Sequence, residues 1–246
     1  MRSWGRQVLA SILVNSVYEM KNYPVVLLNT VLSPLSFLIV ITFVSQGRLI
    51  GDAIEGGFIM SMFQSGMSLQ GDLSHLKNDF KLQDMVVSSP TSSGAYVTGM
   101  AIAEVIYSVP ALAVLTVLLA VYVHPGALQV VELLVVFALM FLASVTLGFT
   151  LSTFSSDIVQ SFAFSRLIST LFSTLPPVYY PITYIPLPFR YAAYLSPTTY
   201  AAEIVQNATG LVSLSQAEID VGWVVLVGVA VILSLIAGKK ARWREV

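Results

Sequence analysis

Cysteine is absent from this sequence of 246 residues. A disulfide framework and a thiolate metal site are therefore both excluded. Charge is scarce as well, because Asp, Glu, Lys and Arg together make up 10% of the residues, whereas a soluble domain has about 25%. With 56% hydrophobic residues and a mean hydropathy of +0.82, the composition favours an all-α integral membrane protein.

Familiar catalytic motifs are missing too. The sequence has no His-Glu-x-x-His and no Gly-x-Ser-x-Gly pattern. A Gly-Lys pair occurs once, at Gly238-Lys239, and Leu233 stands where a phosphate-binding loop has its first glycine. His75 and His124 are isolated, which makes a metal site improbable. We therefore expect no catalytic site, no bound cofactor or metal, and no nucleic acid partner.

Long charge-free runs are what the sequence has instead. About 20 mainly apolar residues cross the hydrocarbon of a bilayer, and runs of this kind predict six transmembrane helices. Arg166 falls inside the fifth of them. The predicted spans are 24–46, 53–71, 94–123, 131–154, 157–176 and 219–238.

Basic residues are distributed unevenly between the segments that connect these spans. An even number of spans puts both chain ends on one side. Of the twelve lysines and arginines, all but Arg48 and Arg190 belong to that side. Because such an excess marks the cytoplasmic face, we expect cytoplasmic termini in a multi-pass protein of the cell (plasma or inner) membrane, surrounded by membrane lipids.

The first 22 residues have the pattern of a helix that lies in the membrane surface. Trp4, Val8 and Ile12 recur at helical spacing, with Arg6 among them. This pattern predicts an amphipathic helix over 1–22 in the cytoplasmic interface. A cleaved signal peptide is the alternative, although no convincing small-residue cleavage site follows.

Prolines and tyrosines concentrate before the last span. Each proline removes an amide donor, and non-helical backbone at membrane depth must be buried in protein or line a wet cavity. We expect the fifth helix to break at Pro176-Pro177 and the chain to re-enter the outer leaflet over 177–210, where Ser196 or Thr198 caps a short helix. An ordinary tyrosine-rich outer loop is the alternative. This outer re-entrant segment is assigned Pro176, Pro177, Tyr180, Pro181, Pro186 and Pro197.

The cytoplasmic segment after the second span predicts a short amphipathic helix over 73–86. Leu73, Leu76 and Phe80 fall on one face, with charged residues around them. Pro90 favours an end to the helix before it. Such a helix suits docking or the transmission of force, and a solvated connector is the alternative.

Two patterns resemble the membrane (permease) subunit of type 2 ABC transporters, a family of exporters of type V architecture. The first is Ser/Thr-Pro, a small polar residue and a later glycine. The second is aromatic-Pro-Ile, Ile-Pro, Ser-Pro-Thr and a terminal glycine. Here they are Ser89, Pro90, Ser92 and Gly99, then Tyr180-Pro181-Ile182, Ile185-Pro186, Ser196-Pro197-Thr198 and Gly210.

The resemblance implies a complex of two such membrane subunits, here two copies of this chain, with two ABC ATPase (nucleotide-binding) subunits, which bind the ATP and Mg²⁺. The helix at 73–86 would be a coupling helix resting on the ATPase. The second and fifth spans of both copies would face a central pathway that the outer re-entrant segment caps. The residues expected to contact the ATPase subunit are His75, Leu76, Lys77, Asp79, Phe80, Lys81 and Asp84.

Spacing on the second and fifth spans gives candidate pathway residues. Phe63 and Met67 are four residues apart and share one helix face. Phe164, Phe172 and Leu175 lie along the fifth span, and Leu175 would form an apolar outer plug. A lipid-facing or helix-packing position is the alternative for each of them.

Two intramembrane charges need separate placement. Arg166 either snorkels to the cytoplasmic headgroups, faces a cavity, or pairs with Glu104. Glu104 itself is expected near the inner surface, as a hydrated start of the third span.

Apolar spans without fixed charges favour a hydrophobic or amphipathic substrate, such as a drug or a lipid-like molecule. The tyrosines leave open an exporter of polysaccharide or lipid-linked glycan. A channel or scaffold subunit without ATP coupling is a further alternative, although neither requires a docking helix.

Overall fold

Long apolar runs form helices here because a helix satisfies its backbone hydrogen bonds internally, which hydrocarbon cannot do for it. The computed structural model describes residues 4–22, 24–78, 92–154, 158–174 and 176–240. No strand occurs among these residues, which confirms the expected all-α class. A helix occupies most of each range predicted as a span. These helices are α3 (Pro24–Val44), α4 (Ile50–Asn78), α6 (Ser93–Tyr122), α7 (Ala127–Phe154), α8 (Ile158–Thr174) and α11 (Gln216–Lys240).

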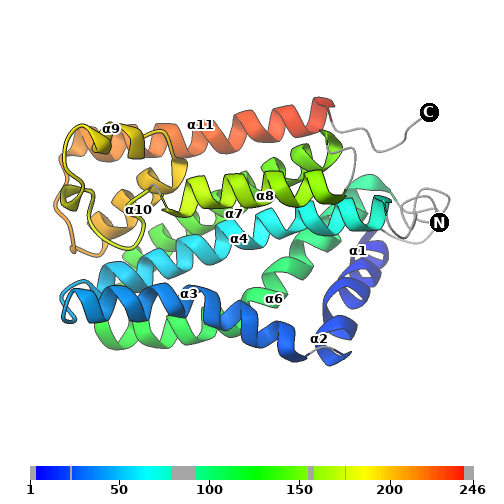
Figure 1. Ribbon diagram of the computed structural model, residues 1–246, viewed down its shortest axis with the longest axis horizontal. Coiled ribbons are helices and arrows are strands. Elements are labelled where there is room, and N and C mark those ends of the chain that lie inside the picture. Colours follow the sequence, from blue (N-terminus) through cyan, green and yellow to red (C-terminus); the bar gives the residue numbers. More distant parts are fainter. Residues whose placement is uncertain (1–3, 23, 79–91, 155–157, 175, 241–246) are drawn as a thin grey trace.

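Three of these helices are long and apolar enough to cross a membrane, by length and composition alone. They are Gly94–Tyr122 in α6, Ala127–Ser152 in α7 and Gln216–Gly238 in α11. In α3, the stretch Thr30–Val44 is apolar but shorter. α4 and α8 run beside the apolar helices along the long axis (Figure 1). The chain is therefore a multi-pass helical membrane protein.

The start of α1 and the end of α11 lie at the same end of this bundle (Figure 1). We call this the terminal end, and it holds the start of α1 and the last turn of α11. The opposite, distal end holds the turns 45–49 and 123–126 together with residues 176–215. This arrangement matches the alternating directions expected from an even number of spans.

α4 is the central helix, since every residue from Gly51 to Phe63 is buried. It packs against α3, α6, α7, α8 and α10. Glycines allow the close approaches. A Cβ atom on Gly66 would lie 1.9 Å from Ser144 Oγ on α7, and one on Gly56 would lie 2.5 Å from the carbonyl oxygen of Val178.

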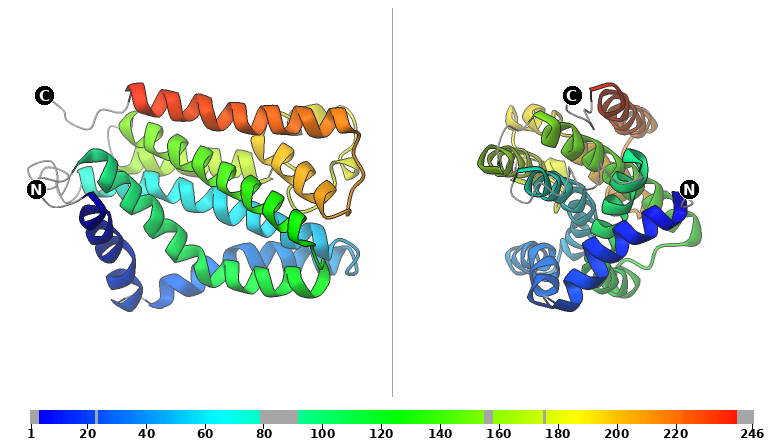
Figure 2. Two further views of the ribbon diagram at one scale, coloured as in Figure 1. Left: turned by 180° about the vertical axis from the view of Figure 1, so that it is seen from behind. Right: turned by 90° about the vertical axis from the view of Figure 1, so that its right-hand side faces the viewer.

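The predicted N-terminal helix is present as α1 (Trp4–Ile12), a π-helical turn (Leu13–Val17) and α2 (Tyr18–Asn22). It packs against α6 at the terminal end (Figure 2). Ser11 Oγ donates to the carbonyl oxygen of Tyr96 at 3.3 Å. Trp4 and Leu9 are among its exposed apolar residues, and its place in the membrane interface stays a prediction.

α3 and α6 each contain a proline, Pro34 and Pro110 respectively. A proline inside a helix removes one backbone hydrogen bond and bends the helix. The bend of α6, drawn in teal and then green, is visible in Figure 2. Both helices pack against α4.

Candidate functional site

The predicted break after the fifth span is present at the distal end. α8 ends at Thr174, and Pro176 and Pro177 are buried. A 3-10 turn, Ile182–Tyr184, and a short helix α9, Phe189–Ala193, follow. The chain then forms α10, Pro197–Ala208, before it reaches α11.

Ser196 caps α10, one of the two residues predicted to do so. Its side chain accepts a hydrogen bond from the backbone N–H of Thr198, and Pro197 occupies the first helical turn. At the other end, Gly210 has a φ of +81°, the left-handed conformation that glycine adopts without strain. The predicted short helix is thus present, and Ser196 caps it.

α10 turns back into the bundle. Most of its residues are buried, and it packs against α4, α7, α8 and α11. Thr198 Oγ1 donates to the carbonyl oxygen of Phe172 at 3.1 Å, which fixes the start of α10 to the end of α8. A solvated loop would not bury a helix in this way.

Two side chains, Arg190 and Tyr194, make hydrogen bonds within the chain between α8 and α11. Arg190 Nη2 donates to the carbonyl oxygens of Thr183 at 3.2 Å and Ile185 at 3.1 Å. Tyr194 OH donates to Glu203 Oε1 at 3.0 Å. Burial raises the pKa of Tyr194 to about 12. Burial also raises the pKa of Glu203, while the hydrogen bond from Tyr194 lowers it.

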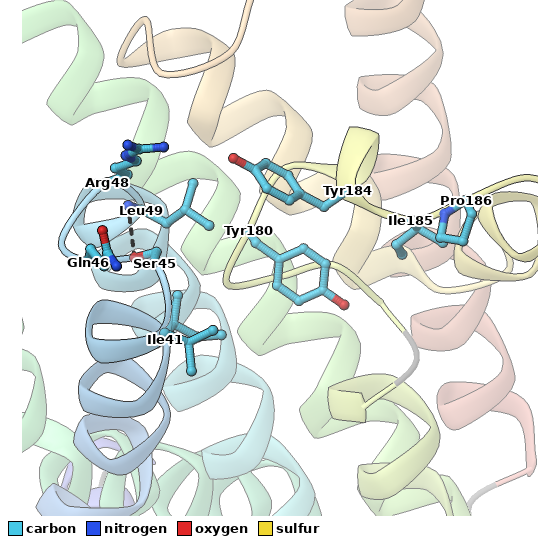
Figure 3. Close-up of a pocket in the computed structure, with 10 residues that line it drawn as sticks. Ile41, Ser45, Gln46, Arg48, Leu49, Tyr180, Tyr184, Ile185 and Pro186 are labelled. Carbon is cyan, nitrogen blue, oxygen red and sulfur yellow. Dashed lines mark hydrogen bonds between the residues drawn. The ribbon is translucent and has the colours of Figure 1, made fainter.

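A pocket of about 670 Å³ opens between the α3–α4 turn and the proline-tyrosine chain (Figure 3). We call it the distal pocket. One wall carries Arg48, which is exposed, and the other carries Tyr180 and Tyr184. Its remaining lining residues are Ile41, Val44, Ser45, Gln46, Leu49, Ile185 and Pro186. The pocket therefore combines apolar surface with a few polar groups and one cation.

A second, almost wholly apolar pocket of about 370 Å³ lies between α4, α7, α8, α10 and α11. We call it the apolar pocket. Phe63 of α4 and Phe172 of α8 both line it, and their rings meet edge to face at 5.5 Å. Pro197 at the start of α10 also contributes. Two helices predicted to face a pathway thus contribute aromatic rings to one apolar space.

The other predicted pathway residues are placed differently. Met67 is buried in the core and does not line the apolar pocket. Phe164 is 36% exposed on the surface of α8. Leu175 lies outside the described residues. The structure brings Phe63 and Phe172 together but not Met67 or Phe164.

In the outer re-entrant segment, Tyr180 and Pro186 line the distal pocket, and Pro181 is half-buried beside them. Together with the buried Pro176-Pro177, this places the predicted proline residues around one end of the bundle. The sequence pattern had located the segment but not the pocket that it closes.

The two intramembrane charges do not meet. Arg166 is exposed on α8, and within the described residues no ion pair joins it to Glu104. Glu104 is 7% exposed and accepts a hydrogen bond from Ser68 of α4. The expectation of a hydrated helix start was wrong, because α6 begins at Ser93 and carries Glu104 about 16 Å along its axis.

At the terminal end, α4 continues without a break to Asn78. The segment carrying His75, Leu76 and Lys77 is therefore the last part of α4, where a separate helix was expected to begin at residue 73. Asp79, Phe80, Lys81 and Asp84 lie outside the described residues. Contact with an ATPase through these seven residues stays a prediction.

A polar link between α4 and α8 was missed in the sequence. Gln70 is fully buried; its Nε2 donates to the Ser161 carbonyl oxygen at 2.9 Å, and its Oε1 accepts from Ser165 Oγ at 2.6 Å. The available signal was a glutamine in one charge-free run and serines four apart in another. Hydrophobic periodicity does not report such pairs.

Comparison with known families identifies this arrangement. Residues 7–209 match the model of the family described as ABC-2 type transporter. A comparison with curated proteins gave no match. The matched range begins within α1 and continues through α10. With multi-pass helical architecture over the same residues, the chain belongs to the ABC-2 type transporter family, as a membrane permease subunit.

Proposed function

We propose that this chain is the permease of an ATP-driven exporter and moves a hydrophobic or amphipathic molecule, such as a drug or a lipid-like compound, out of the cell. Six helices, α3, α4, α6, α7, α8 and α11, would cross the membrane. The terminal end would face the cytoplasm. The observation that carries the proposal is the apolar pocket between Phe63 and Phe172, which lies within a chain that belongs to a transporter family.

Pocket chemistry supports a largely apolar cargo. Phe63 is 2% exposed, and the aromatic edge contact with Phe172 leaves apolar surface on both α4 and α8. A pocket of about 370 Å³ falls within the size range of small-molecule sites. The distal pocket would then accept the cargo at the outer mouth, since it offers apolar walls together with Arg48 and tyrosine hydroxyl groups.

Energy would come from a separate ATPase subunit, which binds ATP and Mg²⁺. α4 would connect the ATPase to the cargo pockets, because it is unbroken from the distal end to Asn78. A tilt imposed on its last turns by the ATPase would move Gln70 and, through its hydrogen bonds, α8. A second copy of the chain would complete the pathway, and opposite tilts would open it inward and then outward.

A polysaccharide or lipid-linked glycan is the second candidate cargo. Tyr180 and Tyr184 favour it, because aromatic rings and hydroxyl groups at one mouth suit sugar rings. These tyrosines line only the distal pocket, whereas the apolar pocket has aromatic rings without hydroxyl groups. A channel or scaffold role without ATP coupling would leave the continuity of α4 without a function.

Transport by a reconstituted complex tests the proposal. The chain and its ATPase partner are placed in proteoliposomes, and the movement of fluorescent amphipathic dyes, lipid analogues and glycolipids is followed with and without ATP. We expect ATP-dependent movement of dyes or lipid analogues, reduced by Phe172→Ala. Movement that is equally fast without ATP would establish a channel, and glycolipid movement alone would establish the second cargo.

A further inference from the structure

A third cavity, of about 250 Å³, lies between α3, α4 and α6. We call it the polar cavity, because hydroxyl, amide and carboxylate groups dominate its walls. Pro34 of α3 also borders it, and this proline loosens the helix at that point. Polar residues from all three helices line it, among them Ser33, Ser61, Ser65, Ser68, Glu104 and Ser108.

The polar cavity lies at mid-depth in the bundle. Ser33, Ser65 and Ser108 each stand next to the midpoint of their own helix, α3, α4 and α6 respectively. If these helices cross the bilayer, the cavity lies close to its central plane. Ionisable residues at that depth are costly and mark functional sites. The prolines of α3 and α6 add interrupted helices at the same level, a feature of ion and substrate sites in transporters.

This cavity is separate from the apolar pocket. Ser61, Ser65 and Ser68 recur at intervals of four and three residues and so share one face of α4. At about 100° per residue, Phe63 points to the other side of the same helix. Neither Phe63 nor Phe172 lines the polar cavity. A ligand in this cavity would therefore not lie on the proposed substrate path.

The serine hydroxyl groups present acceptors to the cavity. A hydroxyl has one proton to donate and two lone pairs. Ser61 Oγ donates to the Gly57 carbonyl oxygen at 2.7 Å, and Ser65 Oγ donates to that of Ser61 at 2.7 Å. Ser108 Oγ likewise donates to the Glu104 carbonyl oxygen at 3.2 Å. The hydroxyl groups of Ser65 and Ser108 also share a hydrogen bond in which either can be the donor. Each of these two oxygens therefore keeps at least one lone pair for a ligand.

Glu104 adds one carboxylate to these oxygen atoms. Ser68 donates to it across the α4–α6 interface, and the hydroxyl groups of Ser65 and Ser108 contact each other one turn away. An array of neutral oxygen acceptors around one carboxylate complements a positive charge. Oxygen ligands suit hard cations rather than soft ones. One carboxylate balances one positive charge.

We propose that the polar cavity binds a small monovalent cation, held by Glu104 and by the hydroxyl oxygens of Ser65 and Ser108. Among the described residues, no group of three or more His, Cys, Asp or Glu side chains could hold a metal ion, which argues against a divalent site. The cation joins α4 and α6 at mid-depth, so its binding stiffens the contact between the central helix and this neighbour. This role goes beyond the proposed export function.

Cation binding is measured on the purified full chain in lipid nanodiscs, with ²²Na⁺ as the probe. Saturable binding is expected, and Glu104→Gln weakens it at least tenfold. Glu132→Gln is the matched control, because Glu132 is a half-buried glutamate of α7 that lies outside the cavity lining. Competition by K⁺ and by methylammonium distinguishes an inorganic ion from the ammonium group of an organic amine, and either competitor is consistent with the site.

Absence of saturable binding, or equal binding by Glu104→Gln and the wild-type chain, would overturn the proposal. Should Glu104→Gln fail to yield folded protein, Ser65→Ala and Ser108→Ala decide. Each removes one hydroxyl ligand and is expected to weaken ²²Na⁺ binding several-fold while the chain still elutes as a single species. Unchanged affinity in both serine variants would count against the site.

Discussion

At the scale of single residues, the fold depends on a few places where helices come very close. Phe63 and Phe172 fill the space between α4 and α8, and two glycines of α4 let α7 and the chain at Val178 approach. Other phenylalanines and glycines of the chain lie in exposed or open positions. Making the same substitution at a packed and at an open position therefore shows how much the packing itself contributes.

Phe63→Ala should lower the free energy of unfolding by about 3–5 kcal/mol, because it empties a fully buried site and removes an aromatic contact. Phe164→Ala removes the same side chain from an exposed position of α8 and should cost within about 0.5 kcal/mol. Denaturant unfolding in detergent micelles measures both. Equal losses in the two variants would show that Phe63 has no special packing role.

Gly56→Ala should destabilise the distal end by about 1–3 kcal/mol, since the new Cβ would meet the Val178 backbone at 2.5 Å. Gly228→Ala is the control, because nothing lies within 4 Å of its Cβ position in α11. There alanine favours the helix, and we expect no loss of stability. Hydrogen exchange over residues 176–186 should rise in the first variant alone. Unaltered exchange there would contradict the close approach.

At the scale of elements, α10 is the segment whose environment is most unusual, because a helix that follows a proline-rich break is buried in the bundle. Glu203 lies within it, with its pKa raised chiefly by burial. The folded chain therefore keeps a proton that the unfolded chain has released. Between the ordinary glutamate pKa and the raised pKa of Glu203, the folded state binds more protons than the unfolded state. The free energy of unfolding therefore falls as pH rises through this range.

Glu203→Gln should remove this pH dependence. Its melting temperature, relative to that of the wild-type chain, should rise as pH increases above the ordinary glutamate pKa of about 4.3, because the uncharged amide does not titrate and can still accept from Tyr194. Tyr194→Phe removes the hydrogen bond that lowers the pKa and should steepen the fall of stability with pH. Parallel melting curves for all three proteins across this range would refute the account.

Helix positions were largely predictable from the sequence, because charge-free runs and proline breaks are local signals. The Ser196 cap of α10 is of this kind. The extension of α4 to Asn78 and the burial of Glu104 were not predictable, since both depend on which helices pack together. The same holds for the three pockets. Serines that line the polar cavity and serines that face lipid look alike until the rotation of each helix is known.

At the scale of the whole molecule, the proposed function requires six helices to cross the bilayer and both ends of the chain to lie in the cytoplasm. α6, α7 and α11 qualify as spans by length and composition. α3, α4 and α8 lie beside them and carry the pockets. The crossing of these three helices is therefore the claim on which export, ATPase docking and the cation site all depend.

Labelling of single cysteines in intact cells tests this claim most directly, and the absence of native cysteine makes each variant report on one position. Gln46→Cys and Ser213→Cys are exposed at the distal end, and Gly5→Cys, Asp72→Cys and Gly238→Cys are exposed at the terminal end. We predict that a membrane-impermeant maleimide labels the first two in intact cells and the other three only after permeabilisation. Labelling of any terminal-end position from outside would contradict the account.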